Sequence, residues 1–269
     1  MQSPINREPE HGSVPAQRVA AGPSFGRAFD RREFHRAFNE LIVGGHFQET
    51  REYYPRYRNR YRSVLKEYAT LAEPRKLDVL EVGGGQHALL AASLWGDRAT
   101  VADLNGPHLE TLRARGVRTA NWDLLSAEQP FRGEFDRAFL CEVIAHVPTP
   151  PHTYLTRLRE SLKPGGKLIV TTPNLHRLRN VVCLASGRKV FDPFALVGTG
   201  QWGGGFLDFS REHLHWQLEH AGFTGVKVAE REFGHAPTSL GARLLHWTFA
   251  PLRVIPRFRY HLLATATAP

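Results

Sequence analysis

The chain of 269 residues has few cysteines and no long apolar run. Its two cysteines, Cys141 and Cys183, cannot build a disulfide framework, and neither belongs to a closely spaced pair of the kind that binds zinc. No stretch approaches the roughly 20 apolar residues that a membrane-spanning helix needs, and the N-terminus lacks a basic segment followed by an apolar one. We therefore expect a cytoplasmic protein with reduced thiols.

Acidic residues are in the minority: the chain has 26 Asp and Glu against 35 Lys and Arg, which gives a net charge of +9. This excess suits an anionic partner such as nucleic acid, a phosphorylated substrate or a membrane surface, but it does not choose among them. Hydrophobic residues make up 42% of the chain and charged residues 23%, which is the composition of an ordinary globular protein. We expect one catalytic domain with additions.

The first 73 residues divide into two segments. Residues 1–28 are rich in Pro, Gly, Ser and charge, so we expect a disordered leader. Residues 29–73 have apolar residues at steps of three and four, which predicts an N-terminal helical extension with one apolar face. The apolar positions are Tyr54, Tyr57, Tyr61, Val64, Leu65, Tyr68 and Leu71. The arginines predicted to fill the other faces are Arg56, Arg58, Arg60 and Arg62.

From residue 74 to residue 269, strand and helix patterns alternate, as in a parallel sheet covered by helices on both faces. The predicted strands are residues 76–82, 99–103, 117–122, 135–141, 167–172, 226–228 and 260–265. The predicted helices are residues 88–94, 107–115, 152–162 and a helix capped by Ser210 that runs to residue 220. Two segments interrupt the pattern: a glycine-rich substrate or lid loop at 174–209 and an amphipathic insertion at 238–258.

Glycines follow the first predicted strand of this region, in the segment Leu-Glu-Val-Gly-Gly-Gly at residues 80–85. Glycines at a strand-to-helix turn let the backbone approach a ligand, and the helix N-terminus offers unpaired N–H donors. About 20 residues further on, Asp103 ends the second predicted strand, where a carboxylate can accept hydrogen bonds from both hydroxyls of a ribose. The third glycine that a dinucleotide needs is missing, because Gln86, His87 and Ala88 follow.

These motifs resemble those of the class I S-adenosylmethionine-dependent methyltransferases. Glu81-x-Gly83-x-Gly85 is similar to the first motif of that family. Asp123-Leu124 resembles its acidic motif near the adenine amine, residues 135–141 its fourth strand, and residues 162–168 its turn into the fifth strand. The similarity covers residues 77–174 and continues more weakly at residues 221–223.

The resemblance implies an α/β fold: a Rossmann-like, doubly wound, mostly parallel seven-stranded sheet with an N-terminal helical extension. It implies S-adenosyl-L-methionine as cofactor. The cofactor-binding residues that it implies are Glu81, Gly83, Gly85, Asp103, Leu104, Asp123, Leu124 and Cys141. His87 departs from the family pattern, because glycine is common at this position. An imidazole there could narrow the pocket for the methionine part of the cofactor, or it could turn outward.

The acceptor of a methyl group is expected above the carboxyl ends of the fourth and fifth strands. The residues there are Cys141, Glu142, His146, Thr172, Asn174 and His176. We predict O-methylation with His146 as general base, because an imidazole titrates near neutral pH and can take a proton from a hydroxyl. Glu142 is predicted to orient a neighbour or the acceptor. A histidine that caps a helix or orients a loop is the alternative for His146.

The segment 141–147 resembles a stretch of small-molecule, quinone and RNA 2′-O-methyltransferases. In some of these enzymes an acidic pair and the histidine bind a divalent metal. Ala145 stands where the second acid would be, so we predict no metal, although Glu142 and His146 with His176 could still form a site.

The predicted acceptor is a small molecule, a glycan or a lipid-like compound rather than nucleic acid. RNA stays an alternative, because residues 51–66 combine arginine with aromatic residues. The tyrosines fall on the apolar stripe, however, which favours a helix packed over the mouth of the cofactor site. Residues 240–258 mix arginine with aliphatic residues and could contact an anionic membrane weakly or form a buried connector. A non-catalytic scaffold is a further alternative, and the intact Glu81, Gly85 and Asp103 argue against it.

Overall fold

The computed structural model describes residues 27–45, 47, 49, 52–71, 73, 75–104, 106–190, 195–196, 202–203, 207–233 and 250–269. Residues 1–26 of the predicted leader and residues 238–249 of the predicted amphipathic insertion lie outside the described residues.

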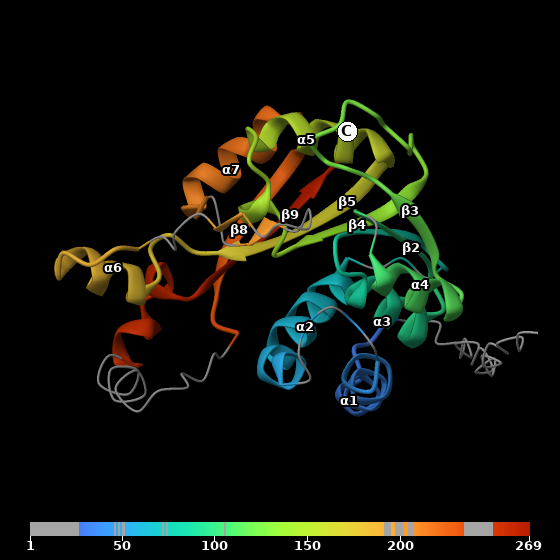
Figure 1. The fold of residues 1–269 in the computed structure, drawn as a ribbon, viewed down its shortest axis with the longest axis horizontal. Coiled ribbons are helices and arrows are strands. Elements are labelled where there is room, and N and C mark those ends of the chain that lie inside the picture. Colours follow the sequence, from blue (N-terminus) through green and yellow to red (C-terminus); the bar gives the residue numbers. More distant parts are fainter. Residues whose placement is uncertain are drawn as a thin grey trace, which may run out of the picture.

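A seven-stranded sheet forms the centre of the protein, as predicted (Figure 1). Its strands are β1 (Asp78–Val82), β2 (Arg98–Asp103), β3 (Arg118–Asn121), β4 (Phe135–Cys141), β5 (Leu162–Pro173), β8 (Thr224–Arg231) and β9 (His261–Thr267). They lie in the order β3-β2-β1-β4-β5-β9-β8, and β9 runs antiparallel to both of its neighbours. The strand order reverses between β1 and β4, which are parallel neighbours. The crevice at the carboxyl ends of the strands at such a reversal is where this kind of sheet binds ligands.

Helices cover both faces of the sheet (Figure 1). The helices on one face are α2 (Tyr53–Thr70), α3 (Gln86–Trp95) and α4 (Pro107–Ala114), and those on the other are α5 (Pro151–Ser161) and α7 (Arg211–His220). Ser210 caps α7 as predicted, because its side chain accepts a hydrogen bond from the backbone N–H of His213. Each face has its own buried apolar cluster.

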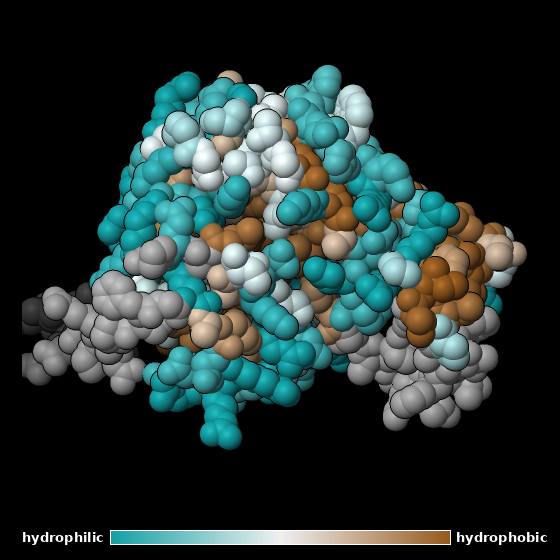
Figure 2. Space-filling view, turned by 180° about the vertical axis from the view of Figure 1, so that it is seen from behind, coloured by the Kyte–Doolittle hydropathy of each residue, from teal (hydrophilic) through white to brown (hydrophobic). Residues whose placement is uncertain are grey.

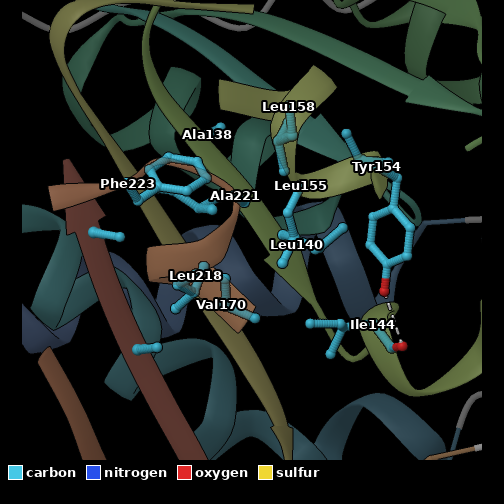
Figure 3. Close-up of a cluster of buried hydrophobic side chains, with 14 of the residues drawn as sticks. Ala138, Leu140, Ile144, Tyr154, Leu155, Leu158, Val170, Leu218, Ala221 and Phe223 are labelled. Atoms are coloured by element: carbon cyan, nitrogen blue, oxygen red, sulfur yellow. Dashed lines mark hydrogen bonds between the residues drawn. The ribbon is translucent and has the colours of Figure 1, made fainter. Parts of the chain in front are cut away.

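The cluster under α5 also holds a turn that follows β4 (Figure 3). Tyr154 of α5 is fully buried, and its hydroxyl donates a hydrogen bond to the carbonyl of Ile144 at 3.2 Å. Ile144 begins the short 3-10 helix η2 (Ile144–His146) and is itself fully buried. The apolar core therefore fixes the turn that carries His146.

The N-terminal extension contains three helical elements, which confirms the helical prediction for this part of the chain. They are α1 (Arg31–Ala37), the π-helix η1 (Phe38–Val43) and α2. The predicted apolar face of α2 packs against α3, and Tyr54, Tyr61, Tyr68 are buried. The prediction for Arg60 is wrong, because this side chain lies inside the protein and is only 5% exposed.

The prediction of an irregular loop at 174–209 is wrong in part. Residues Leu178–Ala185 form the helix α6, and two strands of two residues, Ala195–Leu196 and Trp202–Gly203, pair with each other. The helix has only eight residues and no side-chain cap at Arg177, so it lacks the signals by which a helix is predicted from sequence. No helix among the described ranges is long and apolar enough to cross a membrane.

Asp97 joins the N-terminal extension to the sheet. Its fully buried carboxylate accepts hydrogen bonds from the backbone N–H of Leu77 at 2.9 Å and from the hydroxyl of Tyr68, and it pairs with Arg27 at 2.6 Å. Burial and the neighbouring carboxylate raise the pKa of Tyr68 well above its ordinary value, so this hydroxyl remains a donor. A single buried acid thus connects three segments that are distant in sequence.

We predict that Asp97→Ala lowers the free energy of unfolding by about 3 to 5 kcal/mol, because it leaves the buried guanidinium of Arg27 without its counter-charge. Urea unfolding measures this loss. The control Glu134→Ala removes an acid that pairs with Arg118 at the surface and should cost about 0 to 1 kcal/mol. Equal losses in the two variants would contradict the role given to Asp97.

Candidate active site

A cavity of about 960 Å³ opens at the carboxyl ends of β1 and β4. Its wall combines residues of α2, the glycine turn after β1, the end of β2, the turns after β3 and β4, and the start of β9. Ligand pockets typically measure roughly 300 to 1,000 Å³, so this cavity can hold a cofactor together with an acceptor.

The glycine turn takes a backbone shape that only glycine adopts readily. Gly83, Gly84 and Gly85 have φ values of +88°, +26° and +89°. A Cβ atom at Gly83 would lie 2.5 Å from a methyl group of Val143. Gly83 and Gly84 line the cavity, whereas Gly85 packs against Leu112 of α4, 2.6 Å from where its own Cβ would stand. Gly85 is therefore required for the close packing of this turn, at the start of α3, against α4.

Glu81 closes this turn from inside the protein. One oxygen of its buried carboxylate accepts the backbone N–H of Ala88 at 2.7 Å, and the other lies 2.8 Å from Nδ1 of His87. The ring of His87 is turned inward and stacked between those of Tyr61 and Phe139, at centroid distances of 4.8 Å and 5.5 Å. His87 lines the cavity, and its buried Nε2 has no hydrogen-bond partner among the described residues.

Asp103 presents a carboxylate to the cavity from the end of β2. Its Oδ1 accepts the backbone N–H of Leu104 at 2.7 Å, and its Oδ2 lies 3.0 Å from Nε2 of His108. The Asp103 side chain is 23% exposed, while His108 is buried. His108 therefore fixes the orientation of the acid and leaves lone pairs free for a ligand. The sequence motifs did not indicate this histidine.

The turn after β3 forms a further part of the wall. Asp123 is exposed at the rim of the cavity and accepts the backbone N–H of Leu125 at 2.8 Å, while Leu124 is buried. Leu104 lines the cavity as well. The predicted cofactor residues from β2 and β3 thus share one cavity with the glycine turn.

Glu142 follows β4 and has an unusual backbone. It is the only non-glycine residue of the described part of the chain with a positive φ, +59°. Such a conformation costs about 1 to 3 kcal/mol and persists where the surroundings enforce it. One carboxylate oxygen lies 3.6 Å from a guanidinium nitrogen of Arg60. Burial would raise the pKa of Glu142, but Arg60, His261 and His146 hold it below the ordinary value, so the carboxylate is ionised at neutral pH.

Three of the six residues predicted on the acceptor side line the cavity: Cys141, Glu142 and His146. Burial raises the pKa of Cys141 well above its ordinary value, so it stays a thiol. The other three, Thr172, Asn174 and His176, are not part of the cavity wall. The side-chain amide of Asn174 instead donates to the carbonyls of Arg257 and Arg259, at 2.9 Å each.

The acceptor side also contains residues that sequence motifs did not indicate. These are Tyr53, Tyr57, Arg60, Arg177, Tyr260 and His261. The guanidinium of Arg60 lies over the rings of Tyr53, Tyr57 and Tyr61 at 4.8 to 5.8 Å and donates to the hydroxyl of Tyr53 at 2.9 Å. Helical spacing could have identified Arg60, because it lies three residues after Tyr57 on the same stripe. No group of three or more potential metal ligands occurs among the residues that the structure describes.

Comparison with known proteins identifies the class. A family model described as a methyltransferase domain matches residues 53–228, which is more than half of the chain. The chain therefore belongs to the methyltransferase-domain family, and it is a class I S-adenosylmethionine-dependent methyltransferase. The resemblance found in the sequence is confirmed at this level, and S-adenosyl-L-methionine is the cofactor.

Two solved structures show the same fold. A methyltransferase of Thermotoga maritima, described as a possible histamine N-methyltransferase, is 19% identical, with a TM-score of 0.54 over 88% of this chain and 100% of that chain. Phosphoethanolamine N-methyltransferase 2 of Haemonchus contortus, solved with S-adenosylhomocysteine, is 20% identical, with a TM-score of 0.51 over 78% of this chain and 52% of that chain.

One curated relative matches part of the chain. It is a tRNA U34 carboxymethyltransferase of Chromohalobacter salexigens, 33% identical over 116 residues. The match covers 43% of this chain and 30% of that relative.

The cavity fits the cofactor at three points. Gly83 and Gly84 line the cavity with backbone that carries no side chain, Asp103 offers an oriented carboxylate to a ribose, and the volume admits a second molecule. The residues that would hold the cofactor are Gly83, Gly84, Asp103, Leu104, Asp123 and Leu124.

We predict that Asp103→Ala weakens binding of S-adenosylmethionine tenfold or more, because a charge-assisted hydrogen bond worth roughly 1.5 to 3 kcal/mol is lost. Isothermal titration calorimetry measures the affinity. Glu110→Ala, which removes an exposed acid of α4 outside the cavity, should leave it unchanged. Unchanged affinity in Asp103→Ala, or firm binding of a nicotinamide dinucleotide, would contradict the assignment.

Proposed function

We propose that this enzyme transfers the methyl group of S-adenosylmethionine to a hydroxyl oxygen of a small-molecule, glycan or lipid-like acceptor, with His146 as general base. The observation that carries the proposal is a shared cavity. His146 and Glu142, on the turn after β4, line the same wall as Gly83 and Asp103. The proposed base thus lines the same cavity as the residues that would hold the cofactor.

The bound cofactor supplies a methyl group that is already activated on a sulfonium, so the protein contributes alignment, exclusion of water and a proton acceptor. As the acceptor oxygen gains the methyl group, the bond between that carbon and the sulfonium sulfur breaks and leaves a neutral thioether. His146 would take the hydroxyl proton in this step and later release it to water. The Tyr154 hydroxyl anchors the carbonyl of Ile144, so the backbone turn that carries His146 is held by the core.

Glu142 assists as an ionised neighbour. Its charge and that of a protonated His146 attract each other. Arg60 holds the Glu142 carboxylate from the side of α2. We therefore assign Glu142 to the orientation of His146 or the acceptor, and Arg60 to the orientation of Glu142.

RNA is the second candidate acceptor, because the curated relative acts on tRNA and is 33% identical over 116 residues. The arrangement of α2 favours the small acceptor. Tyr53, Tyr54, Tyr57 and Tyr61 line the cavity, so these rings do not form an exposed platform for stacking bases.

We predict that His146→Ala lowers turnover by roughly 10² to 10⁴-fold, the usual contribution of a positioned base, and leaves cofactor affinity nearly intact. The wild-type rate should rise with pH through the range in which histidine loses its proton, because only neutral imidazole can act as a base, and the variant should lose this rise. His176→Ala is the matched control and should keep the wild-type profile. If His146→Ala keeps it too, the base is another group.

We further predict that a cofactor with a deuterated methyl group labels an oxygen of a small, glycan or lipid-like molecule when the enzyme is incubated with cell extract. Mass spectrometry of the small-molecule, lipid, glycan and RNA fractions identifies the product. Label in RNA alone would replace the proposed acceptor, and label on nitrogen or carbon would refute O-methylation without affecting the methyltransferase class.

A further inference from the structure

Exposed apolar side chains concentrate on two segments beside the cavity. The described residues expose seven large apolar side chains, and five of these lie on α6 or on the turns η3 (Ala250–Val254) and η4 (Pro256–Phe258) with the residue between them. They are Val181, Leu184, Leu252, Val254 and Ile255. Leu184 is 65% exposed and Val254 77%. Figure 2 shows apolar residues gathered where α6 lies, at the right-hand end of the molecule. We call these two segments the apolar rim.

Both segments of the apolar rim lead directly into the cavity wall. Arg177 lines the cavity and α6 begins at the next residue, while Tyr260 and His261 line it just after η4. The two segments are in contact where they join the cavity wall. The side-chain amide of Asn174 donates hydrogen bonds to the backbone carbonyls of Arg257 and Arg259, and the guanidinium of Arg177 lies over the ring of Tyr260 at 5.4 Å. The exposed apolar surface therefore borders the entrance to the site.

The charges of the apolar rim are of one sign. Residues 177–190 and 250–259 contain no Asp or Glu. Their cationic residues are Arg177, Arg179, Arg188, Lys189, Arg253, Arg257 and Arg259. Of these, Arg179, Arg188, Lys189 and Arg257 are exposed. Cationic side chains around exposed aliphatic ones are the pattern of elements that lie in the headgroup layer of an anionic membrane.

We infer that the apolar rim docks on the surface of an anionic lipid bilayer and turns the cavity entrance toward it. Two other occupants fit less well. Nucleic acid uses aromatic side chains to stack bases, whereas these five residues are aliphatic. A second copy of the chain would bring like charges together, which opposes association.

Docking in this position lets an amphiphilic acceptor pass from the bilayer into the cavity. The inference concerns where the enzyme works, and it holds whichever atom is methylated. It goes beyond the sequence prediction for residues 240–258, because α6 adds a second apolar segment beside residues 250–258, and it does not use residues 240–249.

Vesicle flotation with the full chain tests the inference. Wild-type protein should float with vesicles of phosphatidylcholine and phosphatidylglycerol at low salt, but not with phosphatidylcholine alone. High salt should reduce binding, because the attraction to anionic lipid is screened. Protein that stays unbound to the anionic vesicles at low salt would overturn the inference.

Two sets of variants separate the apolar and the cationic contributions. Val181→Glu combined with Leu184→Glu should reduce flotation to the level seen with phosphatidylcholine alone. Arg188→Gln combined with Lys189→Gln should lower partitioning roughly 25-fold, since each cation near the surface contributes about a factor of five. Arg257 is a poorer choice, because it also interacts with Glu212 of α7.

The control is Trp216→Glu, which adds one negative charge, against two in the double variant, on a side chain of α7 that is 51% exposed and outside the apolar rim. It should float like the wild type. All variants should bind S-adenosylmethionine normally, because none of these residues lines the cavity. Wild-type flotation of the Val181→Glu, Leu184→Glu variant would overturn the inference. Sedimentation could instead show that the wild-type protein is a dimer and that these two substitutions dissociate it, and this result would also overturn the inference.

Discussion

Both oxygens of the Glu81 carboxylate are used inside the protein, and the geometry of the cavity depends on them. A buried carboxylate is stable only if it is hydrogen-bonded, and here the partners are the backbone N–H of Ala88 and the imidazole of His87. These bonds hold the first turn of α3 against the end of β1. The glycine turn between them is thereby closed around the space that the cofactor needs.

Through His87, Glu81 also influences the position of α2. This ring stacks on Tyr61, so the position of α3 sets that of α2. Arg60, the residue before Tyr61, forms an ion pair with Glu142, the residue after β4 that has a positive φ. The cofactor side and the acceptor side are therefore one connected arrangement. The departure from glycine at His87 is part of that connection.

The acceptor side is assembled from segments that are far apart in the chain. Its residues come from α2, from the turn after β4, from the residue before α6 and from the start of β9. Asn174 and Tyr154 do not line the cavity, but they hold in place two of the segments that do. The apolar rim continues these same segments outward, so the entrance and its surroundings belong to one structural unit.

Sequence alone predicted the sheet, the helices on both faces, and the cofactor motif, because Glu81, Gly83, Gly85 and Asp103 lie within one strand-helix-strand unit whose spacing is local. It also predicted that Glu142 and His146 lie at the carboxyl end of a strand, where ligands bind. It did not predict α6, which is short and uncapped, or the inward position of Arg60. The contacts of Arg60 and His261 with Glu142 join elements that come together only when the sheet folds, and no local pattern encodes such pairings. The tertiary structure decides these contacts, and they are what makes this site particular within a fold that many proteins share.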